Sequence, residues 1–418
     1  MDNYFTEQTE FYGRTSPNKL IEEYGSPLYV YNENILRQRC REMSNLINYK
    51  RFNVNYSIKA NSNIELLKII KNEGLNADAV SAGDIFVLLK AGFSPNDIFF
   101  VSNNISSEEM NFAIKKGITL SVDSLSQLML YGRLNPGGNV AVRFNPGVGA
   151  GHSEKVITGG KKTKFGINVD YIGEVKNIAK KYNLKIVGIN QHIGSLFMTA
   201  DPYIEGVLSI LSIAENFDNL EFIDFGGGFG IPYRKQEKQP RLDIENLGNK
   251  FEKILDSWVK QYGKDITAKI EPGRYIVAES GVLLGSVYSV KENYGNIYVG
   301  TDLGFNVLMR PVLYDSYHEI EIYRNGKPLI NNDNNEYEIV NIVGNICESG
   351  DIIAKERLLP KIKEGDVIGV MDAGAYGYSM ASNYNNRLRP AEVLIGLDGT
   401  SRLIRKRETL EDIVKNFI

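Results

Sequence analysis

The amino-acid sequence has 418 residues, more than a single hydrophobic core usually supports, so we expect two domains. Hydrophobic residues make up 43% of the chain and charged residues 24%, and these proportions exclude a disordered or fibrous protein. The formal net charge is only −3, so the charge gives no support for a nucleic-acid partner or an anionic membrane surface. A small-molecule partner is favoured.

The chain contains two cysteines, Cys40 and Cys347, which are too few for a disulfide framework and are typical of a reducing cytosol. Its opening stretch, MDNYFTEQTE, is acidic and lacks the apolar core of a secretory signal. No apolar run approaches the roughly 18 residues that span a bilayer. These features predict a cytoplasmic protein that does not enter a membrane.

Between positions 53 and 271, eight short runs rich in β-branched or aromatic residues each end in a polar or glycine-containing cluster. The segments between these runs place apolar residues at three- and four-residue spacing, which predicts a helix after each strand. Eight such units predict an α/β fold of the (β/α)8 TIM-barrel type. The expected strands are NVNYSIKAN, LNADAVSAGD, DIFFVSNN, ITLSVDS, NVAVRFNPG, KIVGINQHIGS, EFIDFGGGFG and TAKIEPGR.

An open, doubly wound sheet also alternates strands with helices and is the alternative architecture. Two features favour the barrel. The strand count reaches eight, and polar clusters follow every strand, as expected where catalytic groups surround the carboxyl end of a barrel. An open sheet would gather such clusters at one crevice.

After Arg274 the helical spacing stops, and from Val282 onward strand-like runs alternate with turn residues, which predicts a C-terminal all-β domain. The run SPLYVYN near the N-terminus has no barrel partner and is a candidate strand of the same domain. We therefore expect the barrel over residues 32–280, and a β-sandwich or barrel-like domain over residues 281–418 together with residues 1–31.

Lys59 ends the first expected strand, in YSIKAN, so we expect its amine at the mouth of the barrel. Partial burial lowers the pKa of a lysine there and suits it to form a Schiff base with an aldehyde cofactor. The alternative is a lysine that lies along the barrel rim with its charge in water.

A cofactor of this kind carries a phosphate, and barrels commonly bind phosphate with the loops after strands seven and eight. Gly226–Gly228 follow the seventh expected strand, and Glu271–Arg274 follow the eighth. Glycines let backbone N–H groups approach a phosphate closely. Plain turn formation by the glycine run is the alternative.

Glu271 and His192 complete the predicted site. A carboxylate against a pyridine nitrogen keeps the ring protonated and makes it a strong electron sink, a role that suits Glu271 unless it is a surface acid. His192, which closes the sixth expected strand, can lie flat on one ring face, although a packed, hydrogen-bonded histidine is the alternative. With three histidines and no pair at ligand spacing, we expect no metal site.

Seven motifs occur in order along the chain: YSIKAN, HIGS, GGGFG, EPGR, DLGFNVLMRPVLYDSYH, GNICESGD and DAGAYGYSMASNYNNRLRP. Together they resemble the diaminopimelate decarboxylase family, a fold-type III, alanine racemase-like group of decarboxylases, and they cover nearly the whole chain. The resemblance implies pyridoxal 5'-phosphate as the cofactor and a barrel with a C-terminal β domain. It also implies a homodimer whose active site is shared across the subunit interface.

The resemblance implies a role for each matching residue. Lys59 becomes the Schiff-base lysine, His192 the ring-stacking residue and Glu271 the partner of the pyridine nitrogen. Asp78, at the end of the second strand, helps to orient the lysine or the histidine. The implied cofactor contacts in the loops are Ser195, Gly227, Gly228, Gly273, Arg274 and Tyr376, of which all but Gly227 contact the phosphate.

Cys347 matches the family's proton donor, which reaches the cofactor of the opposite subunit. Loss of carbon dioxide leaves a carbanion that an acid must protonate, and a positioned thiol suits this task. A buried core cysteine is the alternative. The Cys-Glu-Ser sequence in a turn region favours the catalytic interpretation.

The resemblance also implies how the substrate is chosen. Diaminopimelate carries a second carboxylate beside its distal ammonium, so recognition needs added cations as well as an acid. Arginine offers the two-pronged geometry that carboxylates prefer, and a glutamate suits the ammonium. The matching residues are Arg274, Arg310, Tyr314, Glu348 and Tyr376. The alternative is that Arg310 only forms an ion pair at the domain junction.

The sequence thus predicts decarboxylation of meso-2,6-diaminopimelate to L-lysine, the last step of lysine biosynthesis. A related substrate, such as carboxynorspermidine, ornithine or arginine, is the alternative. An amino-acid racemase is a weaker hypothesis, because racemases of this architecture resemble one another in placing an arginine at the ring nitrogen, where this chain has Glu271. A non-catalytic cofactor-binding protein would lack the β domain that carries Cys347 and Tyr376.

Overall fold

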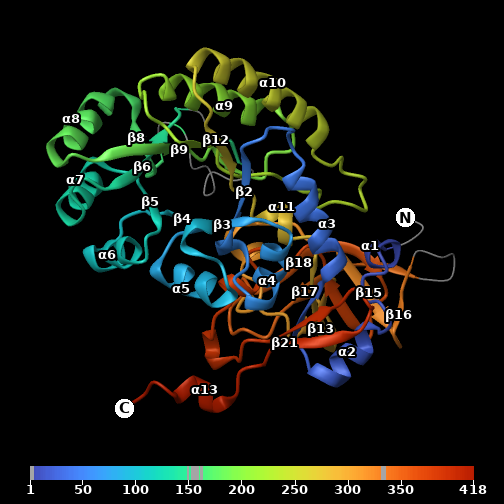
Figure 1. Ribbon diagram of the computed structural model, residues 1–418. Coiled ribbons are helices and arrows are strands. Elements are labelled where there is room, and N and C mark those ends of the chain that lie inside the picture. The colour runs from blue at the N-terminus through green and yellow to red at the C-terminus, as the bar shows by residue number, and fades with distance from the viewer. Residues whose placement is uncertain (1–3, 148–149, 152–159, 161–162, 331–335) are drawn as a thin grey trace. The chain divides into compact units, whose positions relative to one another are not determined.

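The computed structural model describes residues 4–147, 150–151, 160, 163–330 and 336–418. The chain forms two compact units (Figure 1). The barrel unit comprises residues 39–231 and 241–276, and the β unit comprises residues 1–38, 232–240 and 277–418. Each unit is therefore assembled from separate stretches of the chain.

Eight parallel strands of the described chain close into a barrel, as the sequence pattern predicted, and the open-sheet alternative is wrong. The strand order is β5-β4-β3-β2-β12-β11-β9-β6, and β6 pairs with β5 to close the ring. The strands are β2 (Phe52–Ser57), β3 (Asn76–Ala79), β4 (Ile98–Val101), β5 (Thr119–Val122), β6 (Asn139–Asn145), β9 (Lys185–Asn190), β11 (Phe222–Asp224) and β12 (Thr267–Ile270). Three two-residue strands accompany them: β7 (Ala150–Gly151), β8 (Ile167–Asn168) and β10 (Gly194–Ser195).

Helices follow the barrel strands and run around the outside of the barrel, whereas α3 precedes the first barrel strand (Figure 1). Their ends are set by local chemistry: in α5, the Ser81 hydroxyl accepts a hydrogen bond from the Asp84 N–H at 3.1 Å, and Gly92 ends the helix in the left-handed region at φ 95°. The helices are α3 (Glu33–Ser44), α4 (Ile64–Asn72), α5 (Ala82–Ala91), α6 (Ser107–Lys115), α7 (Leu125–Leu134), α8 (Ile172–Tyr182), α9 (Asp201–Ala214), α10 (Ile244–Tyr262) and α11 (Arg274–Val277).

The carboxyl ends of the barrel strands present the polar residues singled out in the sequence. Lys59 lies in a 3-10 turn, Ile58–Ala60, directly after β2. Asp78 is the third residue of β3, and Glu271 follows β12 by one residue. Parallel strands that close into a barrel bring these ends to one face, which positions side chains from distant parts of the sequence together.

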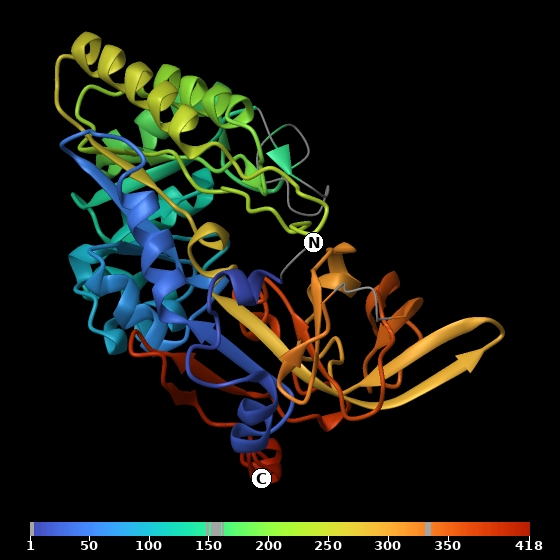
Figure 2. The same cartoon turned by 90° about the vertical axis from the view of Figure 1, so that its right-hand side faces the viewer.

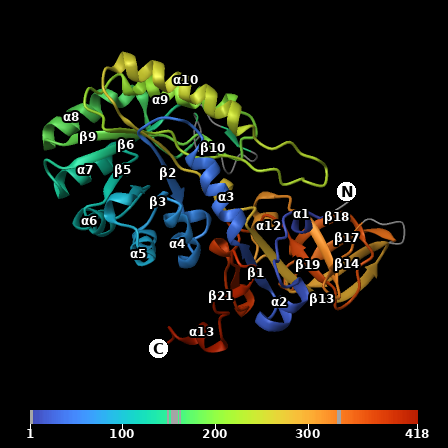
Figure 3. The ribbon, with the colours of Figure 1, turned by 45° about the vertical axis from the view of Figure 1, so that its right-hand side comes forward.

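A ten-stranded sheet forms the described part of the β unit. At its centre β1 pairs antiparallel with β13 and parallel with β20, so an N-terminal strand lies between strands from the C-terminal part of the chain (Figure 3). Figure 2 shows the long hairpin of β13 and β14. The strands are β1 (Leu28–Asn32), β13 (Gly281–Asn293), β14 (Asn296–Thr301), β15 (Ile320–Arg324), β16 (Lys327–Pro328), β17 (Tyr337–Val343), β18 (Ile352–Pro360), β19 (Val367–Val370), β20 (Ala391–Ile395) and β21 (Ser401–Arg405).

One strand of this sheet, β18, was not expected from the sequence. In β18 the charged run Lys355–Arg357 interrupts the apolar pattern, and Glu356 has a left-handed φ of 49° where the register with β17 shifts. A bulge of this kind hides a strand from pattern reasoning. Short helices also belong to this unit: α1 (Phe5–Gln8), α2 (Pro17–Tyr24), α12 (Arg310–Tyr314) and α13 (Leu410–Val414). Within the described ranges, no helix has both the length and the apolar character that crossing a bilayer requires.

Candidate active site

A cavity of about 350 Å³ lies at the carboxyl ends of the barrel strands, within the size range of small-molecule sites. Its lining includes both Lys59 and Glu271, which come from the first and the last barrel strands. The closed barrel thus brings together the amine and the carboxylate on which the predicted site depends. The cavity is lined by Lys59, Asp78, Val80, Val101, Asn103, Arg143, Phe165, His192 and Glu271.

Lys59 reaches this cavity from a tightly packed turn. Its neighbours Ile58 and Ala60 are fully buried, whereas Lys59 itself is exposed. The turn is held by strand pairing of the preceding β2 on both sides, to β3 and to β12. A rigid backbone under an accessible amine suits a residue that must react at a fixed position.

Asp78 and Glu271 are buried acids, 1% and 5% exposed. Burial, together with the Glu271 charge, raises the pKa of Asp78 to about 8, although the Lys59 charge opposes the change. Burial and the Asp224 charge raise the pKa of Glu271 well above its ordinary value, against Lys59 and Arg143. The interpretation of Glu271 as a surface acid is therefore wrong.

One oxygen of each buried acid lacks a donor. The Ser57 hydroxyl donates to Asp78 Oδ2 at 2.6 Å, but Asp78 Oδ1 is buried without a hydrogen-bond partner. Glu271 Oε1 is likewise buried and without a partner. A buried carboxylate oxygen without a donor is costly, so it suits a ligand that brings a proton or an N–H group.

Three further charged residues of the barrel unit were missed by sequence reasoning. Arg143, in β6, lies with its guanidinium 4.5 Å from the Phe165 ring centroid, and burial lowers its pKa against the charges of Glu271 and Asp123. A charged residue at an inward position of an otherwise apolar strand is the signal that would have found it. The other two are Asp224 and Lys269.

Asp224 is fully buried beside Glu271 and accepts a hydrogen bond from the Gly226 N–H at 2.9 Å. Burial raises its pKa to about 6, although that N–H and Lys269 favour the charged form. The Lys269 amine lies 4.0 Å from the Phe222 ring centroid, and burial lowers its pKa against Asp224 and Glu271. Because these acids and bases interact through their charges, the protonation state of each depends on the others.

His192 is half-buried and faces the cavity from the segment after β9. Burial and then the Lys59 and Arg143 charges lower its pKa well below the ordinary value, so the imidazole is neutral. The Gly227 N–H donates to His192 Nδ1 at 3.0 Å, which places the ring proton on Nε2. A neutral, oriented imidazole can pack flat against an aromatic ring.

The glycines of the two predicted phosphate loops are sterically required. A Cβ at Gly227 would lie 1.9 Å from the Glu271 carbonyl oxygen, and one at Gly228, which has a φ of 105°, would lie 2.4 Å from the Gly194 carbonyl oxygen. At Gly273 a Cβ would lie 2.9 Å from Ser57 Cβ. Backbone segments approach one another so closely there that a side chain would not fit at these positions.

Arg274 and Ser195 link two of these loops. The Arg274 guanidinium donates to the Ser195 hydroxyl at 2.9 Å, and Arg274 is 6% exposed. Ser195 ends β10 and is followed by Leu196 in the left-handed region at φ 67°. Together with the glycines, these residues form a donor-rich corner of the barrel unit.

The other predicted site residues belong to the β unit. Arg310 opens α12 and is 1% exposed, and Tyr314 ends that helix, half-buried. Tyr376 is half-buried and has a left-handed φ of 57°, unusual for a tyrosine. The remaining two are Cys347 and Glu348.

Cys347 and Glu348 are both exposed in the loop between β17 and β18. The Asn385 amide oxygen accepts a hydrogen bond from the Cys347 N–H at 2.8 Å, and the Tyr384 hydroxyl donates to Glu348 Oε1 at 2.5 Å. The loop is thus held at two adjacent residues while its thiol remains accessible. The interpretation of Cys347 as a core residue is wrong.

Comparison with known proteins agrees with this geometry. The model of the pyridoxal-dependent decarboxylase pyridoxal-binding domain matches residues 33–278. A diaminopimelate decarboxylase from Methanothermobacter thermautotrophicus is 41% identical over 406 residues, which cover 95% of this chain and 92% of that protein. The chain belongs to the diaminopimelate decarboxylase family. It is accordingly a pyridoxal-dependent decarboxylase, a carboxy-lyase, and pyridoxal phosphate is its cofactor.

Two further relatives show how far the similarity extends. Diaminopimelate decarboxylase from Escherichia coli strain K12 is 35% identical over 411 residues, covering 95% of this chain and 94% of that protein. The crystal structure of diaminopimelate decarboxylase from Helicobacter pylori complexed with L-lysine has a TM-score of 0.86 at 32% identity. It covers 95% of this chain and 98% of that chain, so the family fold extends through both units.

The residues present fit pyridoxal phosphate. Glu271 Oε1 offers a buried acceptor for a ring N–H, and the neutral His192 offers a flat face in the same cavity. The close-packed glycines and the Arg274–Ser195 pair offer donors for a phosphate. No group of three or more His, Cys, Asp or Glu side chains is arranged to hold a metal ion in the part of the chain that the structure describes.

Proposed function

We propose that this chain decarboxylates meso-2,6-diaminopimelate to L-lysine and carbon dioxide, in the cytoplasm, as the last step of lysine biosynthesis. The observation that carries the chemistry is the meeting of Lys59, His192 and Glu271 at one cavity. The substrate assignment is supported by the names of the relatives, which are diaminopimelate decarboxylases across nearly the full length of the chain.

In this proposal the barrel unit holds the cofactor, with one further contact from Tyr376 of the β unit. Lys59 anchors it covalently, His192 packs on one ring face and Glu271 accepts the ring N–H. Asp78, hydrogen-bonded to Ser57, helps to orient Lys59 or His192. When bound, the cofactor supplies an electron sink for the charge that develops on Cα as carbon dioxide leaves. The phosphate contacts are Ser195, Gly228, Gly273, Arg274 and Tyr376, with Gly227 beside them.

The substrate's far end is recognised by charge and geometry. Arg310 and Arg274 pair with the distal carboxylate, Tyr314 and Tyr376 donate further hydrogen bonds, and Glu348 accepts from the distal ammonium. Removing one partner of a buried, charge-assisted pair costs far more than removing a surface pair. A diamine-forming substrate such as ornithine leaves the arginines without their carboxylate and is therefore disfavoured.

Cys347 is the acid that returns a proton to Cα. Its exposure within this chain supports a shared active site, because a proton donor in bulk water would be in competition with solvent. We therefore propose a homodimer in which Cys347 and Glu348 act at the cavity of the partner subunit. No role falls to nucleic acid or a membrane.

A substrate panel tests the function. Purified protein with pyridoxal phosphate should release carbon dioxide from meso-diaminopimelate and form lysine, with kcat/KM at least about 100-fold above that for ornithine, arginine or carboxynorspermidine. Faster turnover of any of the other three would overturn the substrate assignment. Racemisation without carbon dioxide release would overturn the reaction class.

Mixing two nearly inactive variants tests the shared site. Lys59→Ala and Cys347→Ala are each expected to retain at most about 1% of wild-type activity alone. After exchange of subunits, half of the dimers combine the two variants and carry one intact site, so about a quarter of wild-type activity should return. Absence of recovery, with subunit exchange confirmed by tagged chains, would place both residues in one subunit's site.

A further inference from the structure

His318 is a buried histidine that no step above uses. It is 1% exposed and lies in the β unit, two residues before β15. Its Nδ1 lies 2.7 Å from the Met371 carbonyl oxygen, and its Nε2 lies 2.8 Å from Arg310 Nη1. A carbonyl only accepts and a guanidinium only donates. The contacts therefore require a neutral imidazole with its proton on Nδ1 and with Nε2 as the acceptor.

This contact holds Arg310 without cancelling its charge. A carboxylate in the same place would neutralise the guanidinium, whereas a neutral imidazole nitrogen accepts one N–H and adds no negative charge. Arg310 is 1% exposed, so protein contacts rather than water determine how its guanidinium is oriented. The contact with His318 therefore orients the guanidinium without adding a negative charge beside it.

Tyr233 fixes the plane of the same guanidinium. Arg310 Cζ lies 4.9 Å from the Tyr233 ring centroid, and that ring meets the His318 ring edge-on, with centroids 5.3 Å apart at 78°. One side chain thus contacts the face of the guanidinium and another its edge. Bidentate recognition of a carboxylate depends on this plane, because both N–H groups must point at the two oxygens together.

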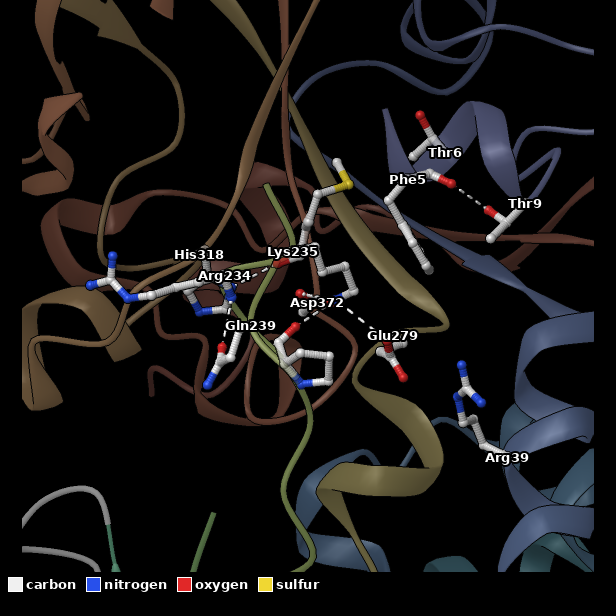
Figure 4. Close-up of polar contacts among 12 residues, drawn as sticks. Phe5, Thr6, Thr9, Arg39, Arg234, Lys235, Gln239, Glu279, His318 and Asp372 are labelled. Atoms are coloured by element: carbon white, nitrogen blue, oxygen red, sulfur yellow. Dashed lines mark hydrogen bonds and ion pairs between the residues drawn. The ribbon is translucent and has the colours of Figure 1, made fainter. Parts of the chain in front are cut away.

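The segments that carry these two contacts are tied together. Lys235, two residues after Tyr233, donates to both oxygens of Asp372 at 2.6 Å and lies 3.4 Å from Glu279 (Figure 4). Asp372 directly follows Met371, whose carbonyl oxygen meets His318. The ion pair between Lys235 and Asp372 therefore links the segment that carries Tyr233 to the segment that carries Met371. Figure 4 shows this pair beside His318.

We propose that His318 is a positioning residue that orients the Arg310 guanidinium toward the carboxylate at the far end of the amino-acid substrate. The proposal rests on the proposed function, in which Arg310 binds that carboxylate. It deepens that function by naming the side chain that determines how the carboxylate is recognised, and it assigns His318 no contact with the cofactor or the reacting atoms.

The central experiment compares His318→Leu with His318→Gln in the holoenzyme. Leucine fills similar space without an acceptor, and KM for meso-diaminopimelate should rise about 10- to 100-fold, the range for loss of a hydrogen bond to a charged group. The amide oxygen of glutamine can replace Nε2, so KM should return to within a few-fold of wild type. The absorbance of the bound cofactor should be unchanged in both.

Two inhibitors separate carboxylate recognition from general damage. L-lysine retains the far carboxylate, and cadaverine lacks it. His318→Leu should weaken inhibition by L-lysine by the same factor as KM and leave inhibition by cadaverine unchanged. Equal weakening of both would overturn the proposal. Tyr12→Phe, which removes a buried hydroxyl contact with Tyr323 in the same unit, is the control and should lower the melting temperature without changing KM.

A double-mutant cycle with Arg310→Leu distinguishes a failure of the positioning role of His318 from a failure of the substrate-binding role of Arg310. If His318 acts through Arg310, then His318→Leu adds nothing to the effect of Arg310→Leu. Additive effects would overturn the positioning role and leave the proposed function standing. An unchanged KM in Arg310→Leu alone would instead overturn the substrate-binding role of Arg310. Should His318→Leu not fold, His318→Asn, which is too short to reach Arg310, replaces it.

Discussion

The barrel cavity and the Cys347 loop hold their reactive side chains in opposite ways. In the cavity, Asp78 and Glu271 are buried, and burial raises the pKa of both, with a further contribution from the Glu271 charge for Asp78 and from the Asp224 charge for Glu271. In the β unit, Cys347 and Glu348 are exposed, and their loop is held by contacts to Asn385 and Tyr384. The barrel alone therefore shifts the pKa values of the acids and bases that would surround a cofactor. The proposed proton donor, Cys347, instead needs another surface to enclose it.

The two cysteines show the same contrast. Cys40 is fully buried in α3, as expected of a small hydrophobic side chain, and Cys347 is exposed. Both lie beside charged residues, but only Cys347 stands in a turn sequence, Cys-Glu-Ser, which favours a catalytic interpretation. Burial assigns one to packing and leaves the other available for chemistry.

Removal of the Lys59 amine, the proposed covalent anchor of the cofactor, should have the largest effect on activity among the changes proposed below. In Lys59→Ala, activity should fall more than about 10³-fold, as when a covalent-catalysis residue is removed, and the absorbance of covalently bound cofactor should disappear. Lys68→Ala, on the exposed face of α4, is the control and should retain both. Retained absorbance in Lys59→Ala would mean that another group anchors the cofactor.

Removal of the exposed Cys347 thiol should have the second-largest effect on activity. Cys347→Ala should lower kcat about 10²-fold, the lower end for loss of a general acid, with cofactor absorbance and melting temperature unchanged. Cys40→Ala should do the reverse, lowering the melting temperature through a small core cavity while kcat stays at the wild-type value. Steady-state kinetics with calorimetric melting measures both. If the two variants changed kcat and melting temperature alike, the exposed and the buried cysteine would not differ in role.

A glycine packed against the Glu271 backbone should tolerate substitution less well than a glycine on the outer surface. Gly227→Ala forces the Glu271 backbone to move and should destabilise the protein by about 1–3 kcal/mol. Gly173, exposed in α8 with nothing near its Cβ position, is the matched control, and Gly173→Ala should stabilise by about 0.5–1 kcal/mol. Urea denaturation measures both changes. A tolerated Gly227→Ala would show that the loop is less closely packed than its contacts indicate.

The buried Asp78 should make the stability of the protein depend on pH. Its folded-state pKa of about 8 lies above the ordinary value of 3.8, so between pH 4 and 8 the folded chain holds a proton that the unfolded chain has released. The free energy of unfolding must therefore fall as pH rises through this range. Asp78→Asn should flatten the slope in cofactor-free protein, and Asp201→Asn, at an exposed site, should leave it unchanged.

The sequence by itself determined the barrel and the location of its chemistry. Strand and helix periodicities are local properties, so eight alternations identified the fold, and the residues after each strand marked Lys59, His192 and Glu271 as cavity residues. The glycines near Gly227 were also foreseen, because close backbone approach leaves no room for a side chain.

Only the tertiary structure decided which charges meet. Asp224 and Glu271 come into contact because neighbouring strands end at one face, and their pKa values depend on burial and on distances that no local pattern encodes. The same holds for His318, whose partners Arg310 and Met371 lie on separate elements of the β unit. Local sequence fixes periodicity and turns, whereas desolvation and charge contacts exist only once the chain has closed on itself.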